Sequence, residues 1–137
     1  MKNVAVKVID RLILVAYGTG NPTDAEWDEY LDLVKRHGVD RTMQLIYTGG
    51  GEPSAPQRRA LNELLGGYPV AVAVVSSSVR VRGTVTALSW FNRRVRAFPT
   101  SAWRDAIAYL EIPTSRADLI EREMQKLRLE LGARRCA

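Results

Sequence analysis

The side chains that most often carry catalysis or bind metals are scarce in this chain. Among its 137 residues there is one histidine, His37, and one cysteine, Cys136. A lone cysteine excludes an internal disulfide and an all-cysteine metal site, and a lone histidine leaves little for zinc binding or a Ser-His-Asp triad. No nucleophile–base pair is apparent, so we expect no enzymatic activity, no catalytic residue, no bound metal and no cofactor.

Three polar loops are the next candidates for chemistry. Segments 18–21, 48–51 and 76–78 are rich in glycine, serine and threonine, and each follows an apolar run. In a parallel sheet such loops gather at one edge, beside helix N-termini whose free N–H groups favour anions. The alternative is that tight strand-to-helix turns need these residue types for geometry alone. The candidate residues for an anion or ligand are Thr48, Gly49, Gly50, Ser76, Ser77 and Arg82.

Ser54 is a candidate for regulation by phosphorylation. A phosphate on its hydroxyl would meet the positive end of a helix and the neighbouring Arg58-Arg59 pair. The competing interpretation is that Ser54 only caps this helix, because Gln57 follows three residues later in the pattern of a capping box.

The positive charge is concentrated in one part of the chain. The formal net charge is +5, and residues 80–104 hold six arginines without any acidic residue. Such a block favours a polyanion or an acidic protein face, although a solvated arginine edge would have the same composition. Aromatic residues do not alternate with these arginines as a base-stacking surface requires, so we do not expect nucleic acid binding.

Hydrophobic periodicity predicts strands that alternate with helices. Alternation or continuous apolar runs indicate strands, and helical spacing between capping signals and glycines indicates helices. The stretch from Val79 fits either type, and its helical spacing favours a helix that ends near Asn92. The expected strands are 4–8, 12–17, 43–48, 70–75 and 95–98, and the expected helices are 23–38, 54–66, 79–92, 100–110 and 115–131.

This order predicts an α/β fold with a mostly parallel sheet of four to five strands. The first strand joins the second through a tight turn at Asp10-Arg11, so it should form an antiparallel edge. We expect one domain over residues 1–112 and a helical extension over residues 113–137. The longest apolar runs fall well short of the about 20 residues that cross a membrane, and the start does not resemble a secretory signal. We therefore expect no membrane insertion and a cytoplasmic location.

The last helix carries an apolar stripe that must be buried somewhere. It could fold back on its own sheet, form a homodimer with a second copy, or meet a different protein. Trp90-Phe91 would mark a further contact surface if these rings were exposed. The candidate interface residues are Trp90, Phe91, Ile120, Met124, Leu127 and Leu131.

Several segments together resemble the STAS domain, in particular its SpoIIAA-like branch of small bacterial proteins. The similarity lies in the strand ending at Tyr17-Gly18, in Asn21-Pro22-Thr23 with Trp27, and in Thr48-Gly49-Gly50-Gly51. It continues through 70–75 and 82–92, and it spans roughly residues 4–112.

The resemblance implies a STAS-like fold and a non-enzymatic regulatory module that exchanges protein partners, as anti-sigma factor antagonists do. That family carries a phosphorylatable serine in an Asp-Ser-Ser-Gly-type motif, which is absent here; Ser54 is the nearest match in position. The other hypothesis, from a different class, is a domain that binds a small ligand, such as phosphate, a nucleotide or a lipid-like molecule, through the loops after the strands.

Overall fold

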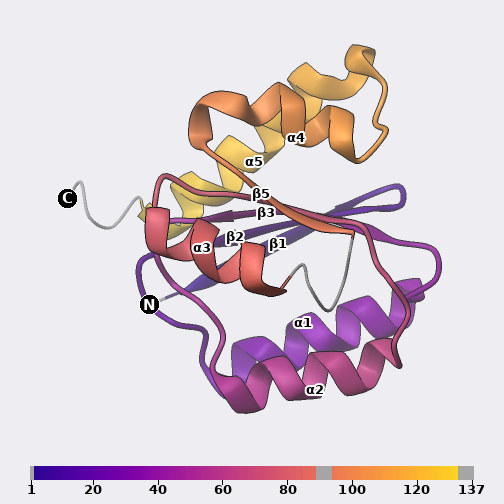
Figure 1. Cartoon of the computed structure of the whole chain (residues 1–137), viewed down its shortest axis with the longest axis vertical. Coiled ribbons are helices and arrows are strands. Elements are labelled where there is room, and N and C mark those ends of the chain that lie inside the picture. The colour runs from indigo at the N-terminus through magenta and orange to yellow at the C-terminus, as the bar shows by residue number, and fades with distance from the viewer. Residues whose placement is uncertain (1, 89–93, 133–137) are drawn as a thin grey trace.

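The computed structural model describes residues 2–88 and 94–132 (Figure 1). Strands and helices alternate along most of the chain, as the sequence predicts. The strands are β1 (Val4–Ile9), β2 (Leu12–Tyr17), β3 (Met43–Thr48), β4 (Val72–Val75) and β5 (Val95–Phe98). The α-helices are α1 (Asp24–His37), α2 (Ala55–Leu65), α3 (Val79–Leu88), α4 (Trp103–Tyr109) and α5 (Ala117–Gly132).

One five-stranded sheet organises the fold, with its strands in the order β1-β2-β3-β4-β5. β1 pairs antiparallel to β2, and the other neighbouring pairs are parallel. The turn between β1 and β2 places Asp10 at a φ of 55°, a left-handed conformation that aspartate tolerates better than most residues. The α/β class, the mostly parallel sheet and the antiparallel edge strand are therefore confirmed.

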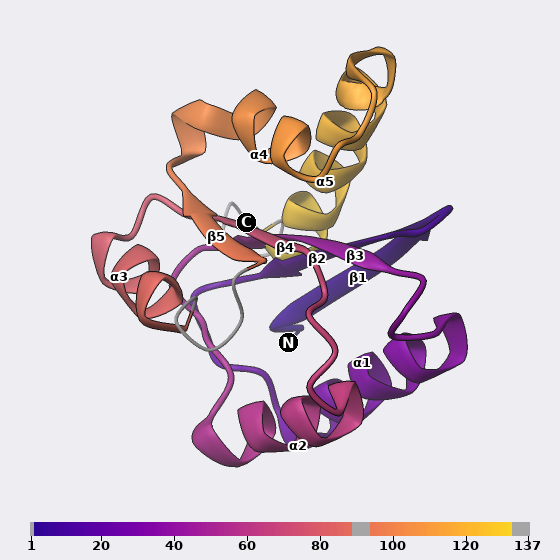
Figure 2. The same ribbon diagram turned by 45° about the vertical axis from the view of Figure 1, so that its right-hand side comes forward.

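Helices cover both faces of the sheet. Each parallel connection leads to the adjacent strand in the same direction, and right-handed crossovers then place α1, α2 and α3 on one face (Figures 1 and 2). The chain reaches the opposite face only after β5, where α4 and α5 pack. β2 is consequently buried along its whole length, with Ile13 and Val15 facing one layer and Leu12 and Leu14 the other.

The stripe on α5 packs against the chain's own sheet. Ile120, Met124, Leu127 and Leu131 are buried in the same core cluster as Leu14. Of the alternatives left open for this stripe, the structure shows that it folds back on its own sheet, so these four candidate interface residues are core residues. The physical reason is that, among the described elements, α5 covers this face of β1 and β2, whereas α4 packs near β4 and β5.

Some element boundaries differ from the sequence expectation, and one lies outside the described residues. β4 begins at Val72 rather than Val70, and α4 begins with a short 3-10 turn over Thr100–Ala102. α3 extends at least to Leu88, and the expected end near Asn92 lies outside the described residues. Among the described helices, none combines the length and apolar character that crossing a membrane requires.

Glu26 fastens the start of β1 to the start of α1. Its carboxylate accepts hydrogen bonds from the backbone N–H groups of Asn3 (2.8 Å), Val4 (3.2 Å) and Thr23 (2.9 Å). Burial by itself raises the pKa of Glu26, but these bonds and one from the Asn3 side chain outweigh it and lower the pKa. The carboxylate thus serves both a helix cap and a strand end.

Replacing Glu26 with alanine is expected to lower the free energy of unfolding by about 2 kcal/mol at neutral pH, since hydrogen bonds to a charged group are stronger than neutral ones. Because the pKa is lower in the folded state, the stabilisation is complete above the ordinary carboxyl pKa. It is lost as the pH falls through the lowered folded value. Urea unfolding of wild type and Glu26→Ala at several pH values should show the difference shrinking in acid. Glu29→Ala, at an exposed position of the same helix, is the matched control.

Candidate functional site

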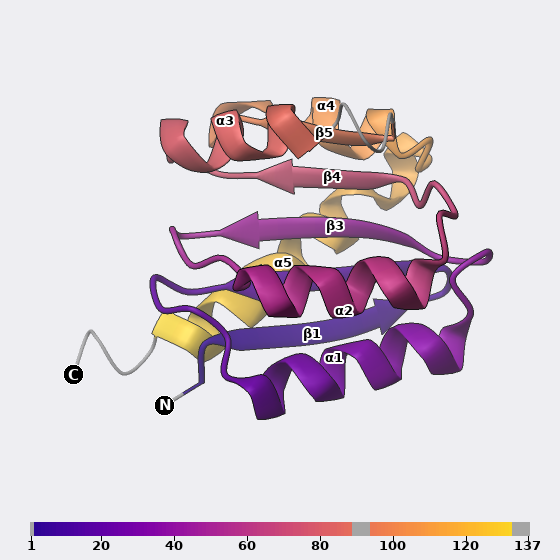
Figure 3. The ribbon, with the colours of Figure 1, turned by 60° about the horizontal axis from the view of Figure 1, so that its bottom comes forward.

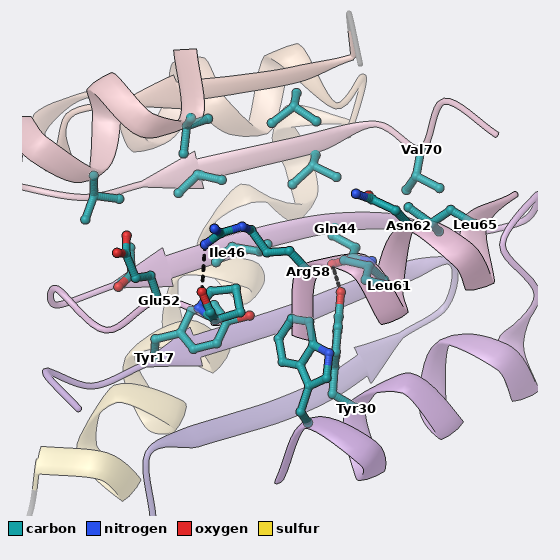
Figure 4. A pocket seen from close by; sticks show the side chains of 18 of the residues that line it. Tyr17, Tyr30, Gln44, Ile46, Glu52, Arg58, Leu61, Asn62, Leu65 and Val70 are labelled. Atoms are coloured by element: carbon teal, nitrogen blue, oxygen red, sulfur yellow. Dashed lines mark hydrogen bonds between the residues drawn. The ribbon is translucent and has the colours of Figure 1, made fainter. Parts of the chain in front are cut away.

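A cavity of about 490 Å³ lies between the sheet and α2, on the face that α1 and α3 also cover. Alternate residues of β3 and β4 form its floor, because side chains on a strand point to the two faces in turn. α2 lies across this face of the sheet (Figure 3), and the lining side chains converge from several elements (Figure 4). The floor residues are Gln44, Ile46, Thr48, Val72 and Val74, and the lining of α2 includes Arg58, Leu61, Asn62 and Leu65.

The way in which α2 is held explains the space beneath it. Ser54 and Gln57 form a complete capping box at its start, and Gly66 in a left-handed conformation ends it. Gln57 is the one fully buried residue of this helix. The indole Nε1 of Trp27 on α1 donates to the Gln57 carbonyl at 2.8 Å, so the helix rests on α1. Leu61 and Leu65 remain only partly buried and face the cavity.

A buried polar pair marks the end of the cavity at the start of β3. The Tyr30 hydroxyl donates to Gln44 Oε1 at 2.5 Å, and Gln44 is only 2% exposed. Burial raises the pKa of Tyr30 well above its ordinary value, and the hydrogen bond to Gln44 offsets only part of that rise. No described residue accepts a hydrogen bond from Gln44 Nε2. This end therefore offers an uncharged N–H donor to the cavity.

The other end of the cavity lies beside the carboxyl ends of β2 and β3. The Tyr17 residue is 5% exposed, and its hydroxyl makes no hydrogen bond with any described residue. Burial, and to a smaller extent the nearby Tyr30, raise the pKa of Tyr17 well above its ordinary value. At this end, Arg58 Nη1 donates to the carbonyl of Pro53 at 2.8 Å (Figure 4).

The two ends are separated by an apolar stretch. Gln44 and Thr48 are four residues apart on β3, which corresponds to about 13 Å at the rise of an extended strand. The side chains between them are aliphatic, with Ile46 and Val74 on the floor and Leu61 above. The cavity thus has the composition of a small-molecule site, apolar in the middle with a few polar groups that could fix a ligand's orientation.

The glycine-rich loop expected to bind an anion instead bonds to the chain itself. The N–H groups of Gly49, Gly50 and Gly51 donate to Tyr17 O (3.1 Å), Thr48 Oγ1 (3.1 Å) and Gly18 O (3.0 Å). Thr48 Oγ1 in turn donates to Gly51 O at 2.6 Å. These contacts join the loop after β2 to the loop after β3, so none of these three N–H groups is left for an anion.

The remaining candidates lie apart from the cavity polar groups. Ser76 is fully buried, and its hydroxyl donates to Thr48 O at 2.8 Å, which fixes the turn after β4. Ser77 is exposed, and Arg82 lies partly buried in α3. Ser54 is exposed at the start of α2, where its hydroxyl accepts from the Gln57 N–H.

Of the polar residues that line the cavity, the sequence analysis named Thr48 as a ligand candidate but not Tyr17, Tyr30, Gln44 or Arg58. Gln44 carried a visible signal, because it is a lone amide in the apolar strand Met43–Thr48. Tyr17 and Tyr30 were counted only as part of apolar segments, and Arg58 only as part of a basic pair beside Ser54. Trp90 and Phe91, expected at a contact surface, lie outside the described residues.

Comparison with known proteins adds no relative from which a role could be transferred. No family model, no curated protein and no solved structure matches this chain. The function must therefore be argued from the cavity and its polar groups.

Proposed function

We propose that this protein binds a small, largely apolar molecule in the cavity beneath α2. The observation that carries the proposal is a pair of polar groups, the Tyr17 hydroxyl and Gln44 Nε2, that line the cavity and make no hydrogen bond with any described residue. A ligand oxygen at either end could accept a hydrogen bond from one of these groups, and a few such contacts are enough to orient a largely apolar molecule.

The size and lining of the cavity support the same proposal. A volume of about 490 Å³ falls within the range of sites for small molecules and cofactors, which are mostly apolar with a few placed polar groups. The lining favours binding over catalysis. The phenols of Tyr17 and Tyr30 have raised pKa values, so neither ionises near neutral pH to act as a general base.

Filling the cavity is expected to abolish binding of a neutral hydrophobic probe. Leu61 faces the cavity from α2, and a tryptophan at this position would occupy much of the space a ligand needs. Wild type should bind N-phenylnaphthylamine saturably at one site, with enhanced probe fluorescence. Leu61→Trp should reduce the affinity at least about tenfold, because the apolar surface of the probe can no longer be buried.

The matched control is Leu129→Trp, which adds the same side chain on the far side of the sheet, at a residue that is 65% exposed. Both variants should keep the circular dichroism spectrum of wild type. Equal probe binding by wild type and Leu61→Trp would contradict the proposal, since binding would then occur elsewhere on the surface.

A regulatory module of the STAS type is a second proposal, together with the cytoplasmic location expected for it. The observation that favours it is the exposure of the Ser54 hydroxyl at the start of α2, the helix above the cavity. A phosphate there would replace the cap and lie close to the first turn of that helix. If wild type binds no probe of any kind, partner binding controlled at Ser54 becomes the leading proposal.

A further inference from the structure

We infer that the cavity ligand is a monocarboxylic acid with an apolar chain, whose carboxylate is held by Arg58 and the Tyr17 hydroxyl. This inference rests on the proposed function and adds the chemical class of the ligand and its orientation. It assigns the charged group to the end of the cavity near Pro53 and the chain to the stretch over Ile46.

The charge at this end of the cavity favours an anion. Arg58 lines the cavity and donates one hydrogen bond to the Pro53 carbonyl. It has no ion-pair partner among the described residues. Glu52 is the one carboxylate among the described residues of the lining, and it already pairs with Arg80 at 3.4 Å. The guanidinium therefore contributes an uncompensated positive charge and several free donors, which match the two oxygens of a carboxylate.

Tyr17 supplies a second donor for the same group. Its hydroxyl makes no hydrogen bond with any described residue, and burial raises its pKa, so the phenol stays protonated and can donate to an anion. Arg58 and Tyr17 come from α2 and β2, and both side chains line the cavity (Figure 4). A charged donor beside a neutral donor suits a carboxylate better than an alcohol or an ester.

The opposite end of the cavity determines the direction and the length of the ligand's apolar chain. Tyr30 and Gln44 are uncharged, so this end offers nothing to a second ionised group. The stretch between the ends measures about 13 Å along β3. An extended chain advances about 3.3–3.6 Å for every three bonds, as the polypeptide backbone does, so about eleven to twelve bonds span this distance.

The test compares decanoic acid with decanol by isothermal titration calorimetry, because the two share a chain and differ in charge. Wild type should bind the acid at least about tenfold more tightly, as expected for a hydrogen-bonded ion pair gained at one end. Arg58→Gln should bind both ligands with the affinity that wild type has for decanol. Arg59→Gln is the matched control, since Arg59 is exposed on α2 and does not line the cavity.

Each result decides the question in one direction. Equal affinity of wild type for the acid and the alcohol would contradict the inference that the ligand carries a carboxylate. A preference for the acid that persists in Arg58→Gln would contradict the inference that Arg58 binds this carboxylate. Either result would leave the proposed function standing. Absence of binding by either ligand would overturn this inference, and the neutral probe then decides the proposed function separately. If Arg58→Gln fails to fold, the ratio of the two affinities in wild type still decides between acid and alcohol, and Arg58→Lys, which keeps the charge, then tests the role of Arg58.

Discussion

A chain that ends at Pro113 is expected to lose its cooperative unfolding transition and to aggregate, because α5 completes the core. Ile120, Met124, Leu127 and Leu131 are buried against the sheet. Burying a large apolar side chain stabilises a fold by about 1.5–3 kcal/mol. The loss of four such side chains is therefore comparable to the about 5–15 kcal/mol that stabilises a whole domain. Truncation would also expose the apolar face of β1 and β2, and an apolar patch of that size promotes aggregation.

Point variants separate loss of packing from loss of the whole helix. Met124→Ala is expected to fold and to lower the free energy of unfolding by about 2–5 kcal/mol, the usual cost of a large-to-small change in a core. Leu129→Ala lies on the exposed side of the same helix and should change it by less than about 0.5 kcal/mol.

Urea unfolding followed by circular dichroism measures both effects, and size exclusion with light scattering reports the state of the truncated chain. A truncated chain that remains a soluble monomer with a sigmoidal transition would contradict the packing of α5. A full chain that is a dimer and dissociates into folded monomers on truncation would instead assign the stripe to self-association.

Local signals account for the parts of the fold that could be predicted from the sequence. Thr23 with Glu26 and Ser54 with Gln57 both form the capping boxes that their spacing predicts. The continuous apolar run Leu12–Tyr17 predicts a strand covered on both faces, and β2 is buried in this way. These features depend on residues close together in the chain, so periodicity and capping patterns are enough to find them.

The cavity could not be predicted, because it depends on how far a helix stands from the sheet. α2 has the amphipathic pattern of a fully packed helix, but its position is set by the bond between Trp27 and the Gln57 carbonyl, across 30 residues. Gln44 reaches the same space only through the register of β3 with β2 and β4. The sequence also could not tell that the glycine N–H groups after β3 bond to the loop after β2.

That junction between loops makes Gly51→Ala the most damaging small substitution expected on this face of the molecule. A Cβ at Gly51 would lie 2.2 Å from the Gly20 carbonyl oxygen and 3.0 Å from that of Gly18, and both obstacles are backbone atoms. The loops must separate to admit it, which weakens the bond from Gly51 N–H to Gly18 O. Overpacking of this kind costs about 1–3 kcal/mol, and a lost buried hydrogen bond adds to it. We expect the free energy of unfolding to fall by about 3 kcal/mol.

Two other glycines provide matched controls for this substitution. Gly83 lies within α3, where a Cβ would meet nothing within 4 Å, so Gly83→Ala should stabilise the chain by about 0.5–1 kcal/mol through its helix preference. A Cβ at Gly18 would lie 3.9 Å from its nearest neighbour, the Asn3 carbonyl oxygen. We therefore expect Gly18→Ala to change the free energy of unfolding only slightly. Because Glu52 and Pro53 directly follow Gly51 and line the cavity, Gly51→Ala should also weaken probe binding while Gly83→Ala should not. Urea unfolding and probe titration of the three variants measure these effects. If Gly51→Ala resembled Gly18→Ala in both measurements, the close packing of the two loops at Gly51 would be contradicted.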